Sequence, residues 1–75
     1  MVKPTTVTHQ IRALRFEHGE MTQADLGRQI GMTRQTVIAI EQGRYSPSLE
    51  TAFRIAQVFG IPLDRVFQYN QGATP

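Results

Sequence analysis

An arginine and a glutamine stand side by side at positions 34 and 35, directly after a threonine, Thr33, that can cap a helix. An arginine guanidinium can donate to both O6 and N7 of guanine, and a glutamine amide can pair with N6 and N7 of adenine. Each pairing discriminates against a wrong base by about 1–3 kcal/mol. Because the first turn of a recognition helix points into the major groove of DNA, we predict that Arg34 and Gln35 read bases.

The predicted helix that carries this pair covers residues 33–42 and has two faces. At about 100° per residue, Val37 and Ile40 point toward a core. The opposite side carries Gln35, Ile38, Ala39 and Gln42. Arg34 lies nearer the core face by angle, but a long side chain in the first turn has room to reach forward. Ala39 can offer its methyl group to the methyl group of thymine.

A helix-turn-helix over residues 22–42 is expected to position this recognition helix. Thr22 is an expected N-cap, and Asp25 three residues later completes a capping box. Gly27 costs about 1 kcal/mol relative to alanine inside a helix, which indicates a close helix crossing. Gly31 suits the left-handed geometry of the turn. The alternative interpretation of these residues is a helical hairpin inside some other small bundle.

Helical periodicity dominates the chain, and no run of alternating apolar residues predicts a strand. We therefore expect an all-α, compact five-helix domain over residues 8–69, whose first helix covers residues 8–18 and whose last helix ends at Phe67. A flexible N-terminal arm is expected over residues 1–7 and a flexible C-terminal tail over residues 70–75.

Residues 21–43 read MTQADLGRQIGMTRQTVIAIEQG. With its surroundings this segment resembles the phage-repressor or Cro-type family of helix-turn-helix transcriptional regulators, also called the Xre family. The likeness covers about residues 11–67 and includes Leu14-Arg15, Thr22-Gln23, Arg34-Gln35-Thr36, Ile40-Glu41, Gly43 and Pro47-Ser48-Leu49. It implies a lambda-repressor-like domain that binds operator DNA, usually as a dimer, and regulates transcription. The chain departs from common members at Phe16 and Ile38, and Glu20 is an extra loop residue.

The resemblance also implies roles for individual residues. It places base contacts at Arg34, Gln35 and Ala39 and a phosphate contact at Gln23. Hydroxyl and guanidinium groups donate to phosphates, so further backbone contacts are expected at Thr22, Thr33, Thr36 and Arg44. The alternative roles are helix capping for the threonines and, for Arg44, a solvated charge at the end of a helix.

A structural ion pair is expected between Arg15 and Glu41. Each charge lies about 40° from an apolar residue on its helix, Ile11 for the arginine and Val37 for the glutamate. The Cro-type family has a buried pair at the matching positions, and a bidentate bond offsets much of the cost of burial. The alternative is that both side chains extend separately to water.

Composition excludes several other functions. The 75 residues carry a formal charge of +2, and seven of the eight basic residues are arginine, which suits phosphate and guanine. No cysteine is present, which indicates a reducing compartment and no Cys-based zinc site.

His9 and His18 would point to opposite sides of one helix, and no catalytic motif or phosphate loop appears in the sequence. We therefore expect no metal, no cofactor, no enzymatic activity and no membrane segment. We expect a cytoplasmic protein that is associated with the nucleoid.

The C-terminal segment is richer in large apolar groups than so small a core can enclose: Phe59, Ile61, Leu63, Val66, Phe67 and Tyr69. We predict a homodimer through the C-terminal helices, which would set two recognition helices about 34 Å apart on double-stranded operator DNA. The alternative is a terminal helix that only completes the core.

The predicted function is a transcriptional regulator without a small-molecule effector. Its alternatives are an antitoxin, a restriction-modification controller, and a protein-interaction module that no longer binds DNA.

Overall fold

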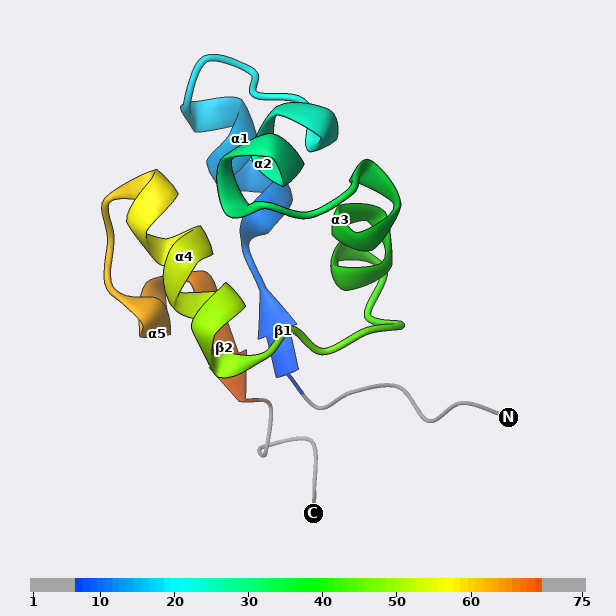
Figure 1. Cartoon of the computed structure of the whole chain (residues 1–75). Coiled ribbons are helices and arrows are strands. Elements are labelled where there is room, and N and C mark those ends of the chain that lie inside the picture. Colours follow the sequence, from blue (N-terminus) through cyan, green and yellow to red (C-terminus); the bar gives the residue numbers. More distant parts are fainter. Residues whose placement is uncertain (1–6, 70–75) are drawn as a thin grey trace.

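A computed structural model describes residues 7–69 of the chain. Within these residues five helices and two short strands follow one another (Figure 1): β1 (Val7–His9), α1 (Ile11–Glu17), α2 (Gln23–Ile30), α3 (Arg34–Glu41), α4 (Leu49–Phe59), α5 (Leu63–Val66) and β2 (Phe67–Tyr69). The domain is therefore mostly helical, as the sequence predicts. No helix in the described part of the chain is long and apolar enough to cross a membrane.

The expectation of an all-α fold is wrong in one respect, because β1 and β2 form a two-stranded antiparallel sheet. The paired residues are Val7 and Tyr69, Thr8 and Gln68, and His9 and Phe67. The first helix consequently begins at Ile11 instead of residue 8, and the last helix ends one residue before Phe67. A strand of three residues is too short to show alternation, and its partner lies at the other end of the chain.

The expected arm and tail fall mostly outside the described residues. This holds for residues 1–6 of the arm and for the whole tail over residues 70–75. Val7, the last residue of the predicted arm, belongs to β1.

Side-chain caps define where three of the helices begin. The hydroxyl groups of Thr22, Thr33 and Ser48 accept hydrogen bonds from backbone N–H groups at the third position of α2, α3 and α4. In α2 the capping box is complete, because the Asp25 carboxylate also accepts from the Thr22 N–H at 3.2 Å. The caps expected from the sequence at Thr22 and Thr33 are present, and each of the three caps satisfies an otherwise unpaired donor.

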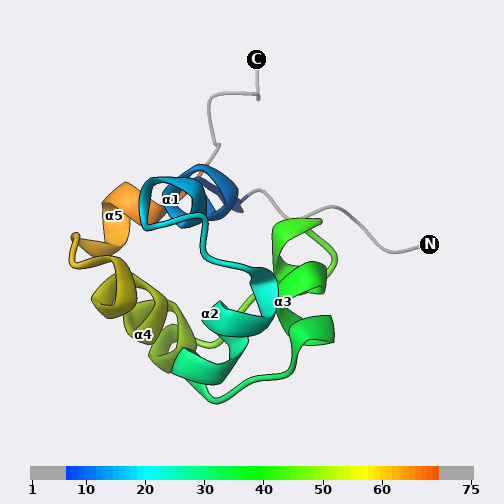
Figure 2. The same ribbon diagram turned by 90° about the horizontal axis from the view of Figure 1, so that it is seen from above.

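All five helices contribute to one core. The largest side chains with almost no exposed surface are Ile11, Leu26, Ile30, Val37, Ile55 and Val66. Helix α2 lies between α3 and α4 and packs against both (Figure 2). Helix α3 is thus held on α2, with its outer side free.

The turn between α2 and α3 depends on two glycines. Gly31 ends α2 with φ of 74°, a left-handed conformation that glycine adopts without strain. Gly27 lies against the turn backbone, where a Cβ atom would come 2.8 Å from the carbonyl oxygen of Met32. The Gly27 carbonyl accepts a 2.8 Å hydrogen bond from the Met32 N–H. Only a residue without a side chain therefore allows this approach.

Candidate nucleic-acid interface

The first turn of α3 presents two long polar side chains to solvent. Arg34 and Gln35 are both exposed, and neither makes an ion pair or side-chain hydrogen bond within residues 7–69. Thr33 caps this turn by accepting a 3.2 Å hydrogen bond from the Thr36 N–H, and the two hydroxyl groups lie 3.0 Å apart. The two donors expected to read bases therefore extend from a capped, regular helix end.

Farther along α3, the other expected contact residues are less exposed. Ala39 and Thr36 are half-buried, as is Ile38. Arg44 follows the helix and is exposed, with its Nε atom donating to the Gln42 side-chain oxygen at 2.8 Å. The structure thus brings Thr33, Arg34 and Gln35 together at one end of the helix and leaves Arg44 beyond the other end.

Gln23 opens α2 and faces α3. Its amide nitrogen donates to Glu41 Oε1 at 3.3 Å, and its side chain is half-buried. A glutamine amide carries two N–H groups, so this bond leaves one donor for another acceptor. Sequence reasoning did not foresee the contact between Gln23 and Glu41.

Arg15 and Glu41 form a buried ion pair beneath the interface. The Nε atom of Arg15 donates to Oε2 at 2.8 Å and Nη2 donates to Oε1 at 3.1 Å, so the pair is bidentate. Both side chains are 9% exposed. Arg15 Nη1 also donates to the Met21 carbonyl at 2.9 Å. This pair joins α1, α3 and the loop before α2.

His9 adds a contact to the same end of α3. Its Nδ1 atom accepts from the Ile11 N–H at 3.2 Å, and its Nε2 atom lies 3.0 Å from the Glu41 backbone carbonyl. Because the amide can only donate and the carbonyl can only accept, Nε2 carries the hydrogen in this arrangement. Sequence reasoning missed this role, since it placed His9 inside a helix and weighed it only as a metal ligand.

The N-terminus of α2 carries an ionised carboxylate. Hydrogen bonds from the Thr22 hydroxyl and backbone N–H, together with the charge of Arg28, hold the pKa of Asp25 below its ordinary value of 3.8. Arg28 forms an ion pair with Asp25. At neutral pH this end of α2 is therefore capped by a negative charge, which the helix dipole also favours.

Comparisons with known proteins agree with this geometry. A family model described as Helix-turn-helix (HTH_3) matches residues 11–66. The chain is 51% identical over 49 residues to the uncharacterized HTH-type transcriptional regulator MJ0272 of Methanocaldococcus jannaschii, covering 65% of this chain and 74% of that protein.

Two further matches connect the chain with a repressor and with a solved structure. It is 37% identical over 54 residues to the cryptic phage CTXphi transcriptional repressor RstR of Vibrio cholerae, covering 72% of this chain and 48% of RstR. The structure of the hypothetical transcription factor NHTF from Neisseria superposes with a TM-score of 0.70 at 27% identity. That match covers 84% of this chain and 71% of the other.

Proposed function

The chain belongs to the helix-turn-helix family of Xre-type, DNA-binding transcriptional regulators, and from this membership we propose that it binds double-stranded operator DNA with α3 in the major groove. One observation carries the proposal. Arg34 and Gln35 are exposed and unpartnered in the first turn of α3, which is the part of a recognition helix that reaches base edges.

The proposed base readout uses three side chains. Arg34 donates to O6 and N7 of a guanine, and Gln35 pairs with N6 and N7 of an adenine. Ala39, one helical turn after Gln35, contacts the methyl group of a thymine. A half-buried position suits this contact, because the short alanine side chain touches the thymine only where the helix itself lies close to the base.

The proposed contacts to the DNA backbone flank this readout. Thr33 and Thr36 lie at the N-terminus of α3 and donate hydroxyl hydrogens to a phosphate. Gln23 offers the N–H group that Glu41 does not use. Arg44, beyond the other end of α3, adds a charged contact that positions the protein without reading sequence.

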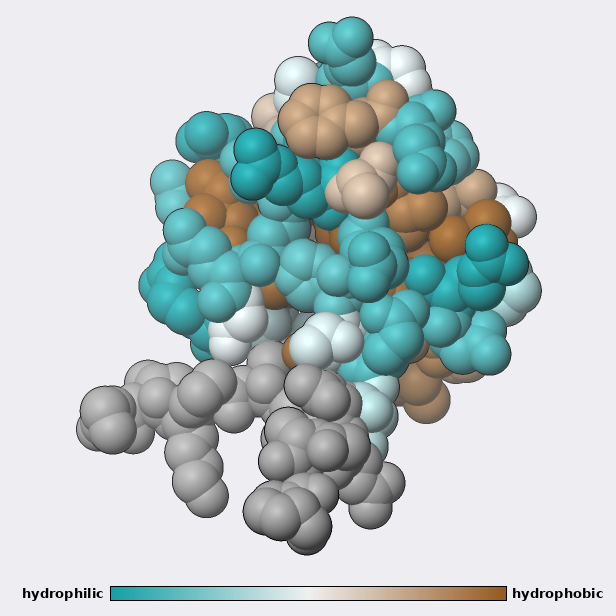
Figure 3. Space-filling view, turned by 180° about the vertical axis from the view of Figure 1, so that it is seen from behind, coloured by the Kyte–Doolittle hydropathy of each residue, from teal (hydrophilic) through white to brown (hydrophobic). Residues whose placement is uncertain are grey.

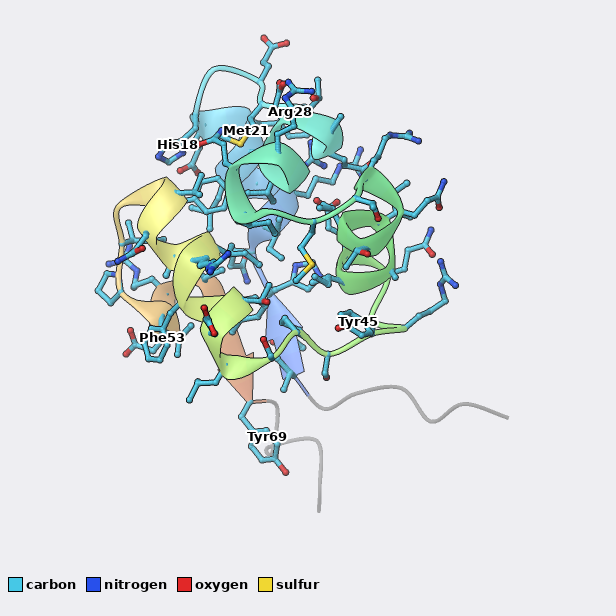
Figure 4. All side chains as sticks on the ribbon, viewed as in Figure 1. His18, Met21, Arg28, Tyr45, Phe53 and Tyr69 are labelled. Carbon is cyan, nitrogen blue, oxygen red and sulfur yellow. The ribbon has the colours of Figure 1, made fainter. Side chains whose placement is uncertain are left out.

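We further propose that the regulator acts as a repressor, as the name of its relative RstR suggests. We also propose that it works as a homodimer. Large apolar side chains remain exposed near the C-terminal segment, with Leu49 at 67%, Tyr69 at 66% and Phe53 at 51%. Phe53 and Tyr69 extend away from the body of the domain (Figure 4). Seen from behind, hydrophobic atoms reach the surface on the side of α4 and α5 (Figure 3).

An apolar groove supports this placement of the dimer contact. It has a volume of about 670 Å³ and is lined by Pro47, Leu49, Leu63, Phe67 and Tyr69 among others. Phe59 and Val66, by contrast, are buried in the core of one chain. We therefore place the contact on the start of α4, α5 and β2. Sedimentation velocity is expected to show a dimer that Leu49→Glu converts to a monomer.

Selection from a pool of random duplexes tests the DNA-binding proposal. The wild-type protein is expected to enrich a twofold-symmetric site. Arg34→Ala and Gln35→Ala are each expected to weaken binding to that site about 5- to 100-fold and to relax the preference at one base pair. Gln29→Ala, at an exposed position of α2 outside both proposed interfaces, is a matched control that leaves affinity unchanged. Failure of the wild-type protein to bind any duplex at low salt would refute the proposal.

A further inference from the structure

A hollow of about 560 Å³ opens beside the proposed interface, between α1, the start of α2 and one side of α3. We call it the α1 hollow. Its lining includes Arg12 and Phe16 of α1, Glu20 of the following loop, and Gln23 and Arg34. The last two belong to the proposed DNA interface, so the hollow is continuous with it.

The charges around the α1 hollow do not cancel. Arg15 and Glu41 also line it, but they neutralise each other in the buried pair. Arg12 is exposed and has no acidic partner within residues 7–69. Glu20 is the acid that remains to oppose Arg12 and Arg34. The hollow therefore has one positive charge in excess, which favours an anionic occupant.

Phe16 gives the α1 hollow an apolar surface next to these charges. The phenyl ring is 54% exposed. The guanidinium carbons of Arg12 and Arg15 lie 5.8 and 5.9 Å from its centroid, within the range of a cation–π contact. The cation of Arg12, which has no acidic partner in the described part of the chain, thus lies beside an exposed ring. A phenyl ring next to a guanidinium is complementary to a deoxyribose next to its phosphate, because the ring can pack against the sugar while the cation pairs with the phosphate.

We propose that the α1 hollow holds a segment of the operator's sugar–phosphate backbone, with Arg12 paired to a phosphate and Phe16 packed against the adjoining deoxyribose. The inference rests on the proposed function, because it places the segment next to the strand that Gln23 and Arg34 contact. It adds a part of α1 to the DNA-binding surface. The added contacts strengthen binding to every sequence and read no base.

Salt dependence of operator binding separates this contact from a general effect of charge. Arg12→Gln removes one phosphate contact, so the slope of log affinity against log salt is expected to fall by about 0.9 for each protomer. Each lost contact is expected to lower affinity about 5- to 10-fold near 0.1 M salt, with no change in the selected sequence. Arg28→Gln removes the same charge from the last turn of α2, outside the proposed DNA and dimer contacts, and is expected to leave the slope unchanged.

Two further variants test the chemistry of the hollow in opposite directions. Phe16→Ala is expected to weaken binding about 3- to 10-fold without changing the salt slope, because it removes an apolar contact and no charge. Glu20→Gln is expected to strengthen binding, since it removes the acid that repels the phosphate. Thermal melting of each variant checks that the fold is retained.

Replacing single operator phosphates with neutral methylphosphonates locates the contact. We expect one such phosphate to weaken wild-type binding and to have no effect on Arg12→Gln. If the wild-type protein binds an operator but Arg12→Gln keeps its affinity and salt slope, the α1 hollow does not contact DNA and the proposed function stands. If the wild-type protein binds no duplex, both proposals fail together.

Discussion

The two ends of α3 differ in how the rest of the protein holds them. At the N-terminal end, Arg34 and Gln35 have no partner in the described part of the chain. At the C-terminal end, Glu41 is held through both its side chain and its backbone. Its carboxylate accepts from Arg15 at 2.8 and 3.1 Å, and its carbonyl lies 3.0 Å from His9 Nε2.

The two ends of α3 therefore have different roles. The C-terminal end fixes the position of the helix, and the N-terminal end carries the side chains that are proposed to bind bases. A side chain already bonded to the protein must break that bond before it can bind a base, whereas Arg34 and Gln35 lose only contacts with water. The helix that carries them must nevertheless be fixed, because a small shift misaligns a bidentate hydrogen bond. Anchoring the last residue of α3, roughly 10 Å along the axis from the first turn, fixes the helix without occupying the side chains that are proposed to bind bases.

The largest expected effect comes from releasing the anchored end. Glu41→Ala leaves the Arg15 guanidinium buried without a counter-charge, so we expect the free energy of unfolding to fall by about 3–5 kcal/mol. Such a loss is a large part of the stability of a small domain. Urea denaturation followed by circular dichroism measures it.

A matched control is available at the next position. Gln42 is exposed, and Gln42→Ala is expected to change stability by no more than about 0.5 kcal/mol. The conservative variant Glu41→Gln retains one acceptor for Arg15 and should lose less than Glu41→Ala. Equal stability of Glu41→Ala and the wild-type protein would show that the pair does not anchor α3.

A smaller effect is expected from moving the free end of α3. In Gly27→Ala the new Cβ atom would lie 2.8 Å from the Met32 carbonyl oxygen and 3.3 Å from the Thr33 carbonyl carbon. Because both atoms belong to the backbone, the turn must shift, and we expect a loss of about 1–3 kcal/mol. This outweighs the gain of about 1 kcal/mol in helix propensity. DNA affinity should fall as well, since the shift reaches Thr33.

Gln29→Ala, at an exposed position of α2, serves as the control for Gly27→Ala in both unfolding and DNA-binding measurements. If Gly27→Ala is more stable than the wild-type protein, the close approach seen in the turn does not limit residue 27.

The free end of α3 could be predicted from sequence far better than the anchored end. Thr33, Gly27 and Gly31 have roles fixed by local rules of capping, crossing and turn geometry, and the structure shows the cap, the close approach and the left-handed turn. The contact between His9 and the Glu41 carbonyl depends on β1 pairing with β2 from the other end of the chain. No pattern within three residues indicates such a pairing, and helical periodicity therefore predicts a first helix that runs over β1.

The predicted dimer surface shows the same limit. Composition indicated that some large apolar side chains near the C-terminus must be exposed, but it could not tell which. Val66 and Phe59 are buried, whereas Tyr69 is exposed because the chain leaves α5 as a strand. Leu49, which lies outside the segment that composition indicated, is also exposed, at the first position of α4.

Removing the cap of α3 is expected to have an effect of about 1 kcal/mol. Thr33→Ala leaves the Thr36 N–H without its 3.2 Å acceptor, and loss of an N-cap side chain costs about 0.5–2 kcal/mol. Thr33→Ser keeps the hydroxyl and should retain most of the stability. Chemical denaturation of the two variants measures the difference. A loss in both variants alike would assign the effect to the methyl group instead of the cap.

The smallest expected effect distinguishes the start of α2 from the start of α3 by pH. The pKa of Asp25 is lowered mainly by the Thr22 hydroxyl, so the carboxylate stabilises the folded state when it is ionised. This contribution is present at neutral pH. It declines as the pH falls below about 5, because the unfolded chain takes up the proton first, and it is lost once the folded carboxyl is also protonated. The unfolding free energy of the wild-type protein minus that of Asp25→Asn should therefore decrease toward acid.

The start of α3 is the control, because Thr33 and Thr36 are neutral. The difference in unfolding free energy between the wild-type protein and Thr33→Ala should therefore not change with pH. A difference for Asp25→Asn that is equally flat would show that the carboxylate does not stabilise α2.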